Sequence, residues 1–269
     1  VNGVFENYQT LDGSTLFLGA FFFTIQIYGD FSGYSDIAIG CARLFGIDLM
    51  QNFKYPYFSR DIAEFWRRWH ISLTTWFRDY IYIPLGGSRV GKWKSFRNTL
   101  VIFLVSGFWH GANWTFVAWG AYHALLFLPL LLLGQNRRYR DSVAENSFLP
   151  SVKELTQMGV TFLLVLLGWI LFRSEDISQA AVYLERMFNA SLFSAPQLVG
   201  LGFGQLLLKK CFFFTALMFI VEWIGRKQAH GLMIEDLSLP VRYVIYTVLL
   251  IIIYGFDASN PQGFIYFQF

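Results

Sequence analysis

Residues 99–134 read TLVIFLVSGFWHGANWTFVAWGAYHALLFLPLLLLG, and this stretch decides the fold class. Its 36 residues include no Asp, Glu, Lys or Arg, and about 20 apolar residues are enough for a helix to cross a bilayer of ~30 Å. His110 lies inside the stretch between Gly107 and Gly111, which loosen a helix around it. An ionisable ring in such a run loses its hydration and needs a partner, so His110 is a candidate functional residue.

The composition of the chain also indicates a membrane protein. Apolar residues make up 55% of the sequence and charged residues 14%, against about 25% charged residues in soluble domains. Aromatic residues alone make up 20%, which is more ring surface than the core of a soluble protein of this size would hide. The net charge of +3 comes from short Lys and Arg clusters between apolar segments, a pattern that argues against nucleic-acid binding.

The two cysteines, Cys41 and Cys211, lie in apolar surroundings and lack the spacing of metal ligands. We therefore expect buried free thiols, no disulfide and no metal site. The chain begins at Val1 without a basic n-region or a cleavage site, so we expect no signal peptide and interpret the chain as the C-terminal part of a longer protein.

Apolar segments predict five or six membrane spans along the chain. The first two, 16–28 and 37–47, are separated by GDFSGYSD, which predicts either a helix break beside a cavity or two short helices with an interfacial turn. Segment 99–134 predicts two helices, or one helix broken at His110–Gly111, and residues 155–172, 211–225 and 243–256 predict the remaining spans. The polar residues of the break that we expect to line a cavity or cap the half-helices are Asp30, Ser32, Tyr34 and Asp36.

Residues 61–80, DIAEFWRRWHISLTTWFRDY, predict an amphipathic helix that is too polar to span and fits an interfacial or re-entrant position. Asp61 with Glu64 three residues later predicts a capping box. His70 belongs to the aromatic face, so it is either packed within an anchor or part of a site. The aromatic face consists of Trp66, Trp69, His70, Leu73, Trp76, Phe77 and Tyr80, whereas Arg67, Arg68, Thr74, Thr75 and Arg78 lie largely elsewhere.

Clusters of Lys and Arg predict which loops face the cytoplasm. The loop 82–97 and the loop 135–154 are both basic, so the positive-inside rule places both on the cytoplasmic side, and the more acidic loop 174–207 fits the outside. Segment 99–134 then enters and leaves on one face, as a helical hairpin or re-entrant pair with His110 near the turn or in the bilayer interior. A single tilted span is the alternative.

Histidine is the residue type on which we base the chemistry, because the chain has no HExxH, GxSxG or phosphate-binding glycine motif. A neutral imidazole can take the proton of a hydroxyl that attacks an acyl donor, which contributes roughly 10²–10⁴-fold. A second polar residue would orient the acceptor or stabilise the oxyanion. His123 lies about 220° around a continuous helix from His110, so we expect it to be packed through a hydrogen bond, and we expect His230 to be solvated.

Four motifs in this order resemble the membrane-bound O-acyltransferases, most closely the alginate O-acetyltransferase branch and more distantly the teichoic-acid D-alanylation relative. They are FSGYSDIAIGCARLFGI at 31–47, FWRRWHISLTTWFRDYIYIPLGG at 65–87, FWHGANWTFVAWGAYHA at 108–124 and FIYFQF at 264–269. The resemblance implies that His110, in the WHG motif, is the catalytic residue and that His70 is the second polar site. The remaining motif residues that we expect to bind substrate are Trp66, Arg67, Trp69, Arg78, Trp109 and Asn113.

The resemblance implies an all-α, polytopic transmembrane bundle in the inner membrane, with residues 1–269 as a single domain that lacks the family's N-terminal spans. It implies acetylation of an exported or cell-surface polysaccharide such as alginate, with acetyl-CoA or another acyl thioester as donor and no bound cofactor. The implied partners are the bilayer, the donor, and extracytoplasmic acetyltransferase or polysaccharide-export proteins. A transporter or proton relay through Asp30, Asp36 and His110 is the alternative, and a scaffold with structural histidines is a third interpretation.

Overall fold

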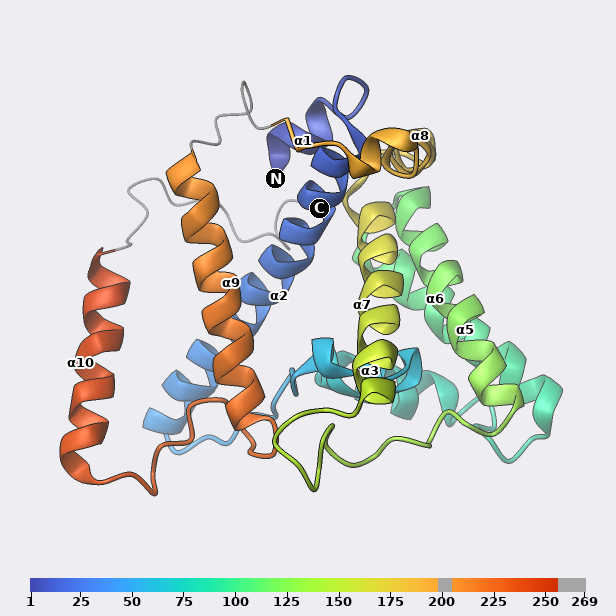
Figure 1. The fold of residues 1–269 in the computed structure, drawn as a ribbon. Coiled ribbons are helices and arrows are strands. Elements are labelled where there is room, and N and C mark those ends of the chain that lie inside the picture. Colours follow the sequence, from blue (N-terminus) through green and yellow to red (C-terminus); the bar gives the residue numbers. More distant parts are fainter. Residues whose placement is uncertain (198–204, 256–269) are drawn as a thin grey trace.

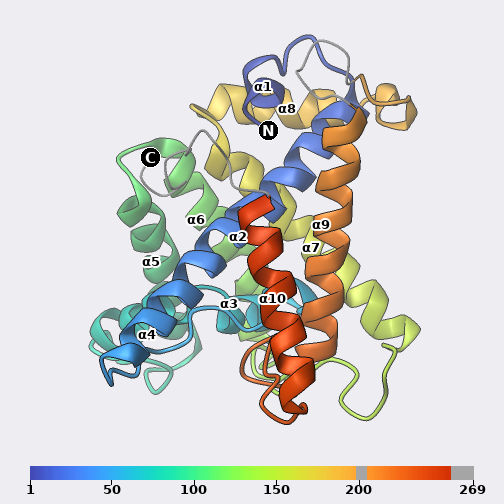
Figure 2. The same cartoon turned by 90° about the vertical axis from the view of Figure 1, so that its left-hand side faces the viewer.

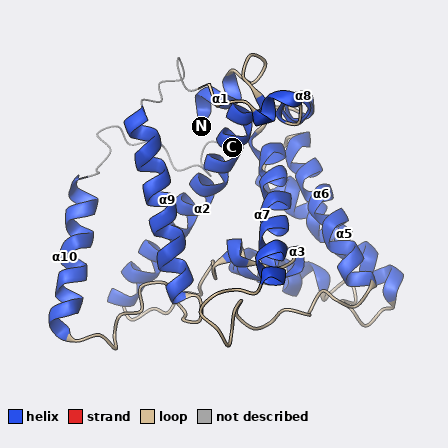
Figure 3. Ribbon diagram, in the orientation of Figure 1, coloured by secondary structure: helices blue, strands red, loops and turns tan. Residues whose placement is uncertain are grey.

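The computed structural model of the chain describes residues 1–197 and 205–255, and these residues form helices and loops without a strand (Figures 1 and 3). The predicted all-α class is therefore confirmed for the described residues. The motif at 264–269 and residue 256 of the last predicted span lie outside them. The shorter elements at the N-terminus and in the connections are α1 (Asn2–Glu6), η1 (Pro56–Phe58) and η3 (Ala190–Phe193).

Helix α2 (Gly13–Leu44) is one continuous helix of 32 residues, so the predicted break over GDFSGYSD is wrong. That segment has no proline, and an isolated glycine costs a helix only about 1 kcal/mol. Tertiary contacts support the helix across the polar segment, where Phe31 and Ser35 are buried. Figure 2 shows α2 running diagonally across the molecule behind α10. Cys41 on α2 is exposed and Cys211 on α9 is partly exposed; both thiols are free as expected, but neither is buried.

Helices α5 (Lys92–His110) and α6 (Trp114–Leu132) form an antiparallel hairpin. This confirms the first of the two predicted alternatives, two helices, and places their boundary at His110–Gly111. Helix α5 ends there because Gly111 is extended, with φ 162° and ψ 160°, and α6 begins where the Asn113 side chain accepts a hydrogen bond from Thr115 N–H (3.1 Å). Helix α5 also includes Lys92, so it starts inside the predicted loop 82–97.

Two glycines allow the backbones of the hairpin to approach closely. A Cβ on Gly107 would lie 2.3 Å from the carbonyl oxygen of Phe116, and a Cβ on Gly120 would lie 2.2 Å from that of Phe103. Both separations are far below van der Waals contact, so only glycine fits at these positions without moving a helix. The packing of residues 103 and 107 against 120 and 116 brings the start of α5 and the end of α6 to the same end of the molecule.

The predicted helix 61–80 is divided into α3 (Ile62–Arg68), α4 (Ile71–Phe77) and the single π-helical turn η2 (Arg78–Tyr82). The prediction of one helix is wrong because His70 adopts a left-handed conformation, with φ 45° and ψ 55°. The predicted N-cap is confirmed, since Glu64 N–H donates to Asp61 Oδ1 (2.7 Å). The second hydrogen bond of a capping box, from the Asp61 N–H to the Glu64 side chain, is replaced. The Glu64 carboxylate accepts from the Arg60 N–H instead (2.7 Å).

Helices also occupy the remaining predicted spans. They are α7 (Val152–Arg173), α9 (Gln205–Gly225) and α10 (Leu239–Gly255), and α8 (Ile177–Met187) follows α7. Among the described residues, α6 and α7 are long and apolar enough to cross a membrane. Helix α7 packs against α2, α3 and α6, and the tryptophans buried at this junction are Trp69, Trp119 and Trp169.

Candidate active site

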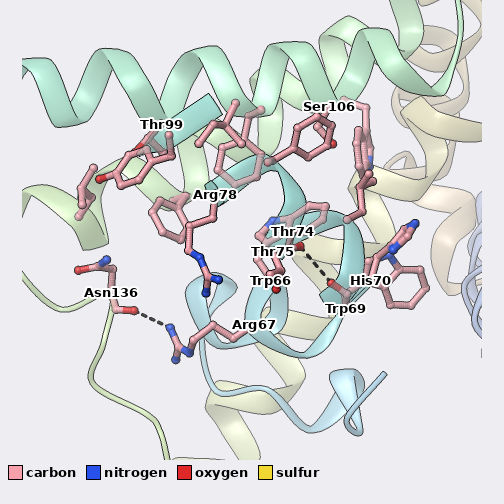
Figure 4. A pocket seen from close by; sticks show the side chains of 18 of the residues that line it. Trp66, Arg67, Trp69, His70, Thr74, Thr75, Arg78, Thr99, Ser106 and Asn136 are labelled. Carbon is pink, nitrogen blue, oxygen red and sulfur yellow. Dashed lines mark hydrogen bonds between the residues drawn. The ribbon is translucent and has the colours of Figure 1, made fainter. Parts of the chain in front are cut away.

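A cavity of about 340 Å³ lies between α3, α4, α5, α6 and α7, and both His70 and His110 line it. The expectation that these two side chains face one cavity is confirmed. Figure 4 shows the side chains of α3 and α4 beneath those of α5. The other predicted residues that line this cavity are Trp66, Arg67, Trp69 and Arg78.

Helix α5 presents one face to the cavity. The residues of this face are Thr99, Ile102, Phe103, Ser106 and His110. The spacing of four, three and four residues from Thr99 to His110 is that of a single helix face. This spacing can be read from the sequence, so it could have predicted Thr99 and Ser106 as cavity residues. The cavity residues Trp119 and Trp169 had no such signal, because the packing of α6 and α7 against the site decides their positions.

His110 is the last residue of α5, and its ring is surrounded by aromatic rings. The ring centroid lies 5.2 Å from that of Trp119 and 5.1 Å from that of Phe172, and both pairs are edge-to-face. Gly111 leaves room for the neighbouring Phe116 ring, since a Cβ there would lie 2.6 Å from that ring.

His70 lies at the junction of α3 and α4 in a conformation that costs a non-glycine residue roughly 1–2 kcal/mol. The segment before α3 stabilises this conformation by two backbone hydrogen bonds, from Ile71 N–H to Asn52 O (3.0 Å) and from Lys54 N–H to Arg68 O (3.0 Å). The left-handed turn directs the ring away from the course of α3. Its centroid lies 4.7 Å from that of Phe31 and 6.4 Å from that of Trp109.

Trp109 connects the two histidines without lining the cavity. Its ring lies 6.4 Å from the His70 ring and 5.0 Å from the His110 ring, both edge-to-face, and the residue is 55% exposed. Asn113 also lies outside the cavity wall, where it caps α6 and donates from Nδ2 to Glu175 O (2.6 Å). The two predicted binding residues therefore support the site from outside, which corrects their expected place in the cavity.

Arginines surround one end of the cavity. Arg67, Arg78 and Arg137 contribute to its lining, and all three are exposed. The Arg67 guanidinium donates to the carbonyl oxygens of Asn136 (2.5 Å) and Tyr139 (2.5 Å), which ties α3 to the loop after α6 (Figure 4). The Arg78 guanidinium pairs with Asp79 (Nε to Oδ1, 2.7 Å). The positive charge of several arginines at one end of an apolar cavity is suited to an anionic ligand.

The profile of the membrane-bound O-acyltransferase family matches residues 4–142, which contain both histidines and the arginine-lined cavity wall formed by α3, α4 and α5. The chain belongs to this family.

The curated relatives that the chain resembles are named for acyl transfer. A probable alginate O-acetylase of Pseudomonas aeruginosa is 43% identical over 196 residues, which are 71% of this chain and 36% of that protein. A peptidoglycan O-acetyltransferase of Helicobacter pylori is 41% identical over 165 residues, 61% of this chain and 30% of that protein. A teichoic acid D-alanyltransferase of Bacillus subtilis is 30% identical over 163 residues, 57% of this chain and 40% of that protein. The chain thus spans about a third of the length of the curated relatives it matches.

A buried ionic network lies behind α3, next to the histidine cavity, and was not among the residues predicted from the sequence. Glu64 is 1% exposed and accepts hydrogen bonds from Arg60 (3.0 Å) and Arg68 (2.6 Å). Arg60 also pairs with Asp141 (3.1 Å) in the loop after α6. Partial burial raises the pKa of Asp141, but the hydrogen bond from Arg60 and backbone N–H groups outweigh it and lower the pKa overall. The network fixes α3 to the loop that carries Arg137.

The acidic residues of α2 do not belong to the histidine cavity, which corrects the expected grouping. Ser32 and Asp36 line a second cavity of about 630 Å³ between α2, α9 and the loop 226–238. Tyr34 is 55% exposed, and neither it nor Asp30 contributes to the wall of either cavity. Asp36 and His110, two members of the alternative proton relay, therefore line different cavities.

The other two histidines of the chain also differ from expectation. His230 lines the second cavity instead of being simply solvated. His123 is fully buried and packs against Trp66 and Trp119, with ring centroids 4.9 and 5.1 Å away. Its packed position is confirmed, but its ring nitrogens have no hydrogen-bond partner among the described residues, so the expected hydrogen bond is wrong.

Proposed function

We propose that this chain forms the catalytic centre of a membrane enzyme that transfers an acetyl group from a thioester donor to a hydroxyl of an exported or cell-surface polysaccharide. The observation that carries this proposal is the meeting of His70 and His110 at one cavity with arginines at its end. The names of the relatives support the acceptor class, since alginate, peptidoglycan and teichoic acid are all polymers of the cell surface or exterior.

His110 acts as the general base in this mechanism. As the acceptor hydroxyl oxygen attacks the carbonyl carbon of the thioester, an imidazole nitrogen of His110 takes the hydroxyl proton. The C–S bond then breaks, and the leaving thiolate takes that proton back, so the products are an ester and a free thiol. The edge-to-face packing of Trp119 and Phe172 holds the imidazole in place. Such a positioned base contributes roughly 10²–10⁴-fold to the rate.

The arginine-lined end of the cavity receives the donor. Arg67, Arg78 and Arg137 would bind the phosphates of acetyl-CoA or of another phosphopantetheine thioester. The apolar remainder of the cavity, about 340 Å³, has room for a thioester arm and a small acyl group. Because Arg137 lies in a loop that we assign to the cytoplasm, the donor enters from the cytoplasmic side.

The chain lies in the inner membrane as a multi-pass bundle in this proposal. Helices α5 and α6 enter and leave on the cytoplasmic face, and α3 with α4 forms the re-entrant or interfacial element. The antiparallel packing of α5 on α6 supports this arrangement, because it places the basic loops before α5 and after α6 at the same end. Partners on the outer side, an acetyltransferase or a polysaccharide-export protein, would receive the acetyl group or the modified polymer.

Polymer ester content in a deletion strain complemented with the intact protein tests the proposal. His110→Ala abolishes acetylation of the polysaccharide because the base is lost. His230→Ala is the matched control, since His230 faces the other cavity, and it retains acetylation at equal membrane abundance. If the deletion strain loses the ester but His110→Ala has a normal ester content, His110 is not the base. If the deletion strain itself keeps a normal ester content, the protein does not transfer acyl groups to that polymer.

A further inference from the structure

Asn52, Ser72 and His70 form a chain of hydrogen bonds at the edge of the histidine cavity. Ser72 N–H and Ser72 Oγ lie 3.2 and 2.5 Å from Asn52 Oδ1. Ser72 Oγ lies 3.4 Å from His70 Nδ1. The backbone of Asn52 is held independently, because its carbonyl oxygen accepts from Ile71 N–H (3.0 Å). The three side chains therefore come from two segments that the backbone already joins.

The direction of each hydrogen bond in this chain follows from which atoms carry hydrogen. A backbone N–H can only donate, so the Asn52 atom that faces Ser72 N–H is the amide oxygen and not the amide nitrogen. That oxygen can only accept, so the Ser72 hydroxyl must use its single hydrogen to donate to it. The Ser72 oxygen is then left as an acceptor toward His70, and His70 Nδ1 must carry the hydrogen of that bond.

We propose that Ser72, oriented by Asn52, is a positioning residue that holds neutral His70 as the Nδ1–H tautomer. The hydrogen bond on one ring nitrogen sets the protonation of the other, so Nε2 of the neutral ring has a free lone pair. This inference rests on the proposed acyl transfer for its functional meaning. Neutral His70 accepts a hydrogen bond through Nε2 and cannot donate one to an oxyanion. It therefore orients the acceptor hydroxyl or the His110 ring and does not stabilise the tetrahedral intermediate.

Nitrogen NMR of the intact protein labelled with ¹⁵N-histidine measures the tautomer directly. The chain has four histidines, so the His70 signals are assigned by their loss in His70→Gln. We expect a protonated Nδ1 and an unprotonated Nε2 in the wild type at a pH where the ring is neutral. Ser72→Ala should shift the population toward Nε2–H, the commoner form of free imidazole side chains, and Ser72→Thr, which keeps the hydroxyl, should restore Nδ1–H.

The Ser72 variants are expected to fold, because the backbone hydrogen bonds that hold the left-handed turn at His70 do not involve the serine side chain. In the acetylation assay, Ser72→Ala and Asn52→Ala should each lower the transfer rate by roughly three- to tenfold, as expected for one neutral hydrogen bond. Ser72→Thr should recover most of that rate. A structural role alone would lower stability without changing the His70 tautomer.

An Nε2–H signal for His70 in the wild type, or an unchanged Nδ1–H signal in Ser72→Ala, overturns the proposal. The NMR result does not depend on turnover. If the tautomer is as expected but the wild type transfers no acyl group to any tested polymer, the proposed function fails while the hydrogen-bond chain stands. If transfer is normal and the tautomer is wrong, only the positioning role of Ser72 fails.

Discussion

Alanine at Gly107 tests the close packing that places His110. The added Cβ would lie 2.3 Å from the Phe116 carbonyl oxygen, and an ordinary contact needs about 3.4 Å, so α5 and α6 must separate by about 1.1 Å at this point. The atoms nearest to the added Cβ belong to the backbone of Phe116 and Val117, so they cannot rotate away as a side chain would. Overpacking of this kind costs about 1–3 kcal/mol, and the better helix propensity of alanine returns about 1 kcal/mol. The net loss of stability is up to about 2 kcal/mol.

The matched control is Gly159→Ala on α7, where nothing lies within 4 Å of the added Cβ. This variant gains the helix propensity without a steric cost, so its stability rises by up to about 1 kcal/mol. The two substitutions are chemically identical and should shift the melting temperature of the purified protein in opposite directions.

Thermal unfolding in detergent, followed by tryptophan fluorescence, provides the measurement. Gly107→Ala should melt up to about 8 °C below the wild type, at about 2–4 °C per kcal/mol for a domain of 150–250 residues. Its transfer rate should also fall, because a shift of about 1 Å in a catalytic group can cost up to about 100-fold. A Gly107→Ala protein whose melting temperature rises as much as that of Gly159→Ala would refute the close antiparallel packing of α5 on α6.

Three further outcomes are expected. His70→Asn should retain more polymer acetylation than His70→Ala, because the amide keeps hydrogen-bonding capacity; equal loss would contradict a positioning role. Glu64→Gln should lower the stability in chemical unfolding by about 3–5 kcal/mol, because buried Arg68 loses its charged partner and buried Arg60 loses one of its three. Asp79→Asn, which breaks the exposed pair with Arg78, should leave the stability nearly unchanged. Single cysteines at Ser88 and Asn136, in a background without the native cysteines, should both resist an impermeant thiol reagent applied to intact cells; labelling of just one would exclude the cytoplasmic hairpin.

Local sequence determined the elements whose signals do not depend on the rest of the chain. Hydropathy without charge predicted the helical stretch 99–134, and Gly111 marked its interruption, since backbone hydrogen bonds in an apolar run are satisfied within helices. Asp61 marked the start of α3 because its side chain accepts a hydrogen bond from the backbone N–H of Glu64, three residues on, which is also a local interaction. The spacing of the residues from Thr99 to His110 also indicates which face of α5 lines the cavity.

Two predictions failed where contacts distant in sequence override local preference. The polar segment of α2 looks like a break, yet the helix continues because buried contacts such as that of Phe31 with His70 support it. The segment 61–80 looks like one helix, yet it turns at His70 because Asn52 supplies a hydrogen-bond acceptor to Ile71 N–H. No property of residues 61–80 alone reports the position of Asn52.

The sequence by itself determined the residue types of the site, the apolar setting of His110 and the family resemblance. The tertiary structure alone decided that His70, forty positions earlier, shares a cavity with His110 while Asp36 lies in another. The physical reason is that hydropathy and helix periodicity specify which face of a segment is buried, but not which segments meet. That choice depends on side-chain shape and backbone approach, such as Gly107 against Phe116, and on the left-handed turn that brings His70 to the cavity.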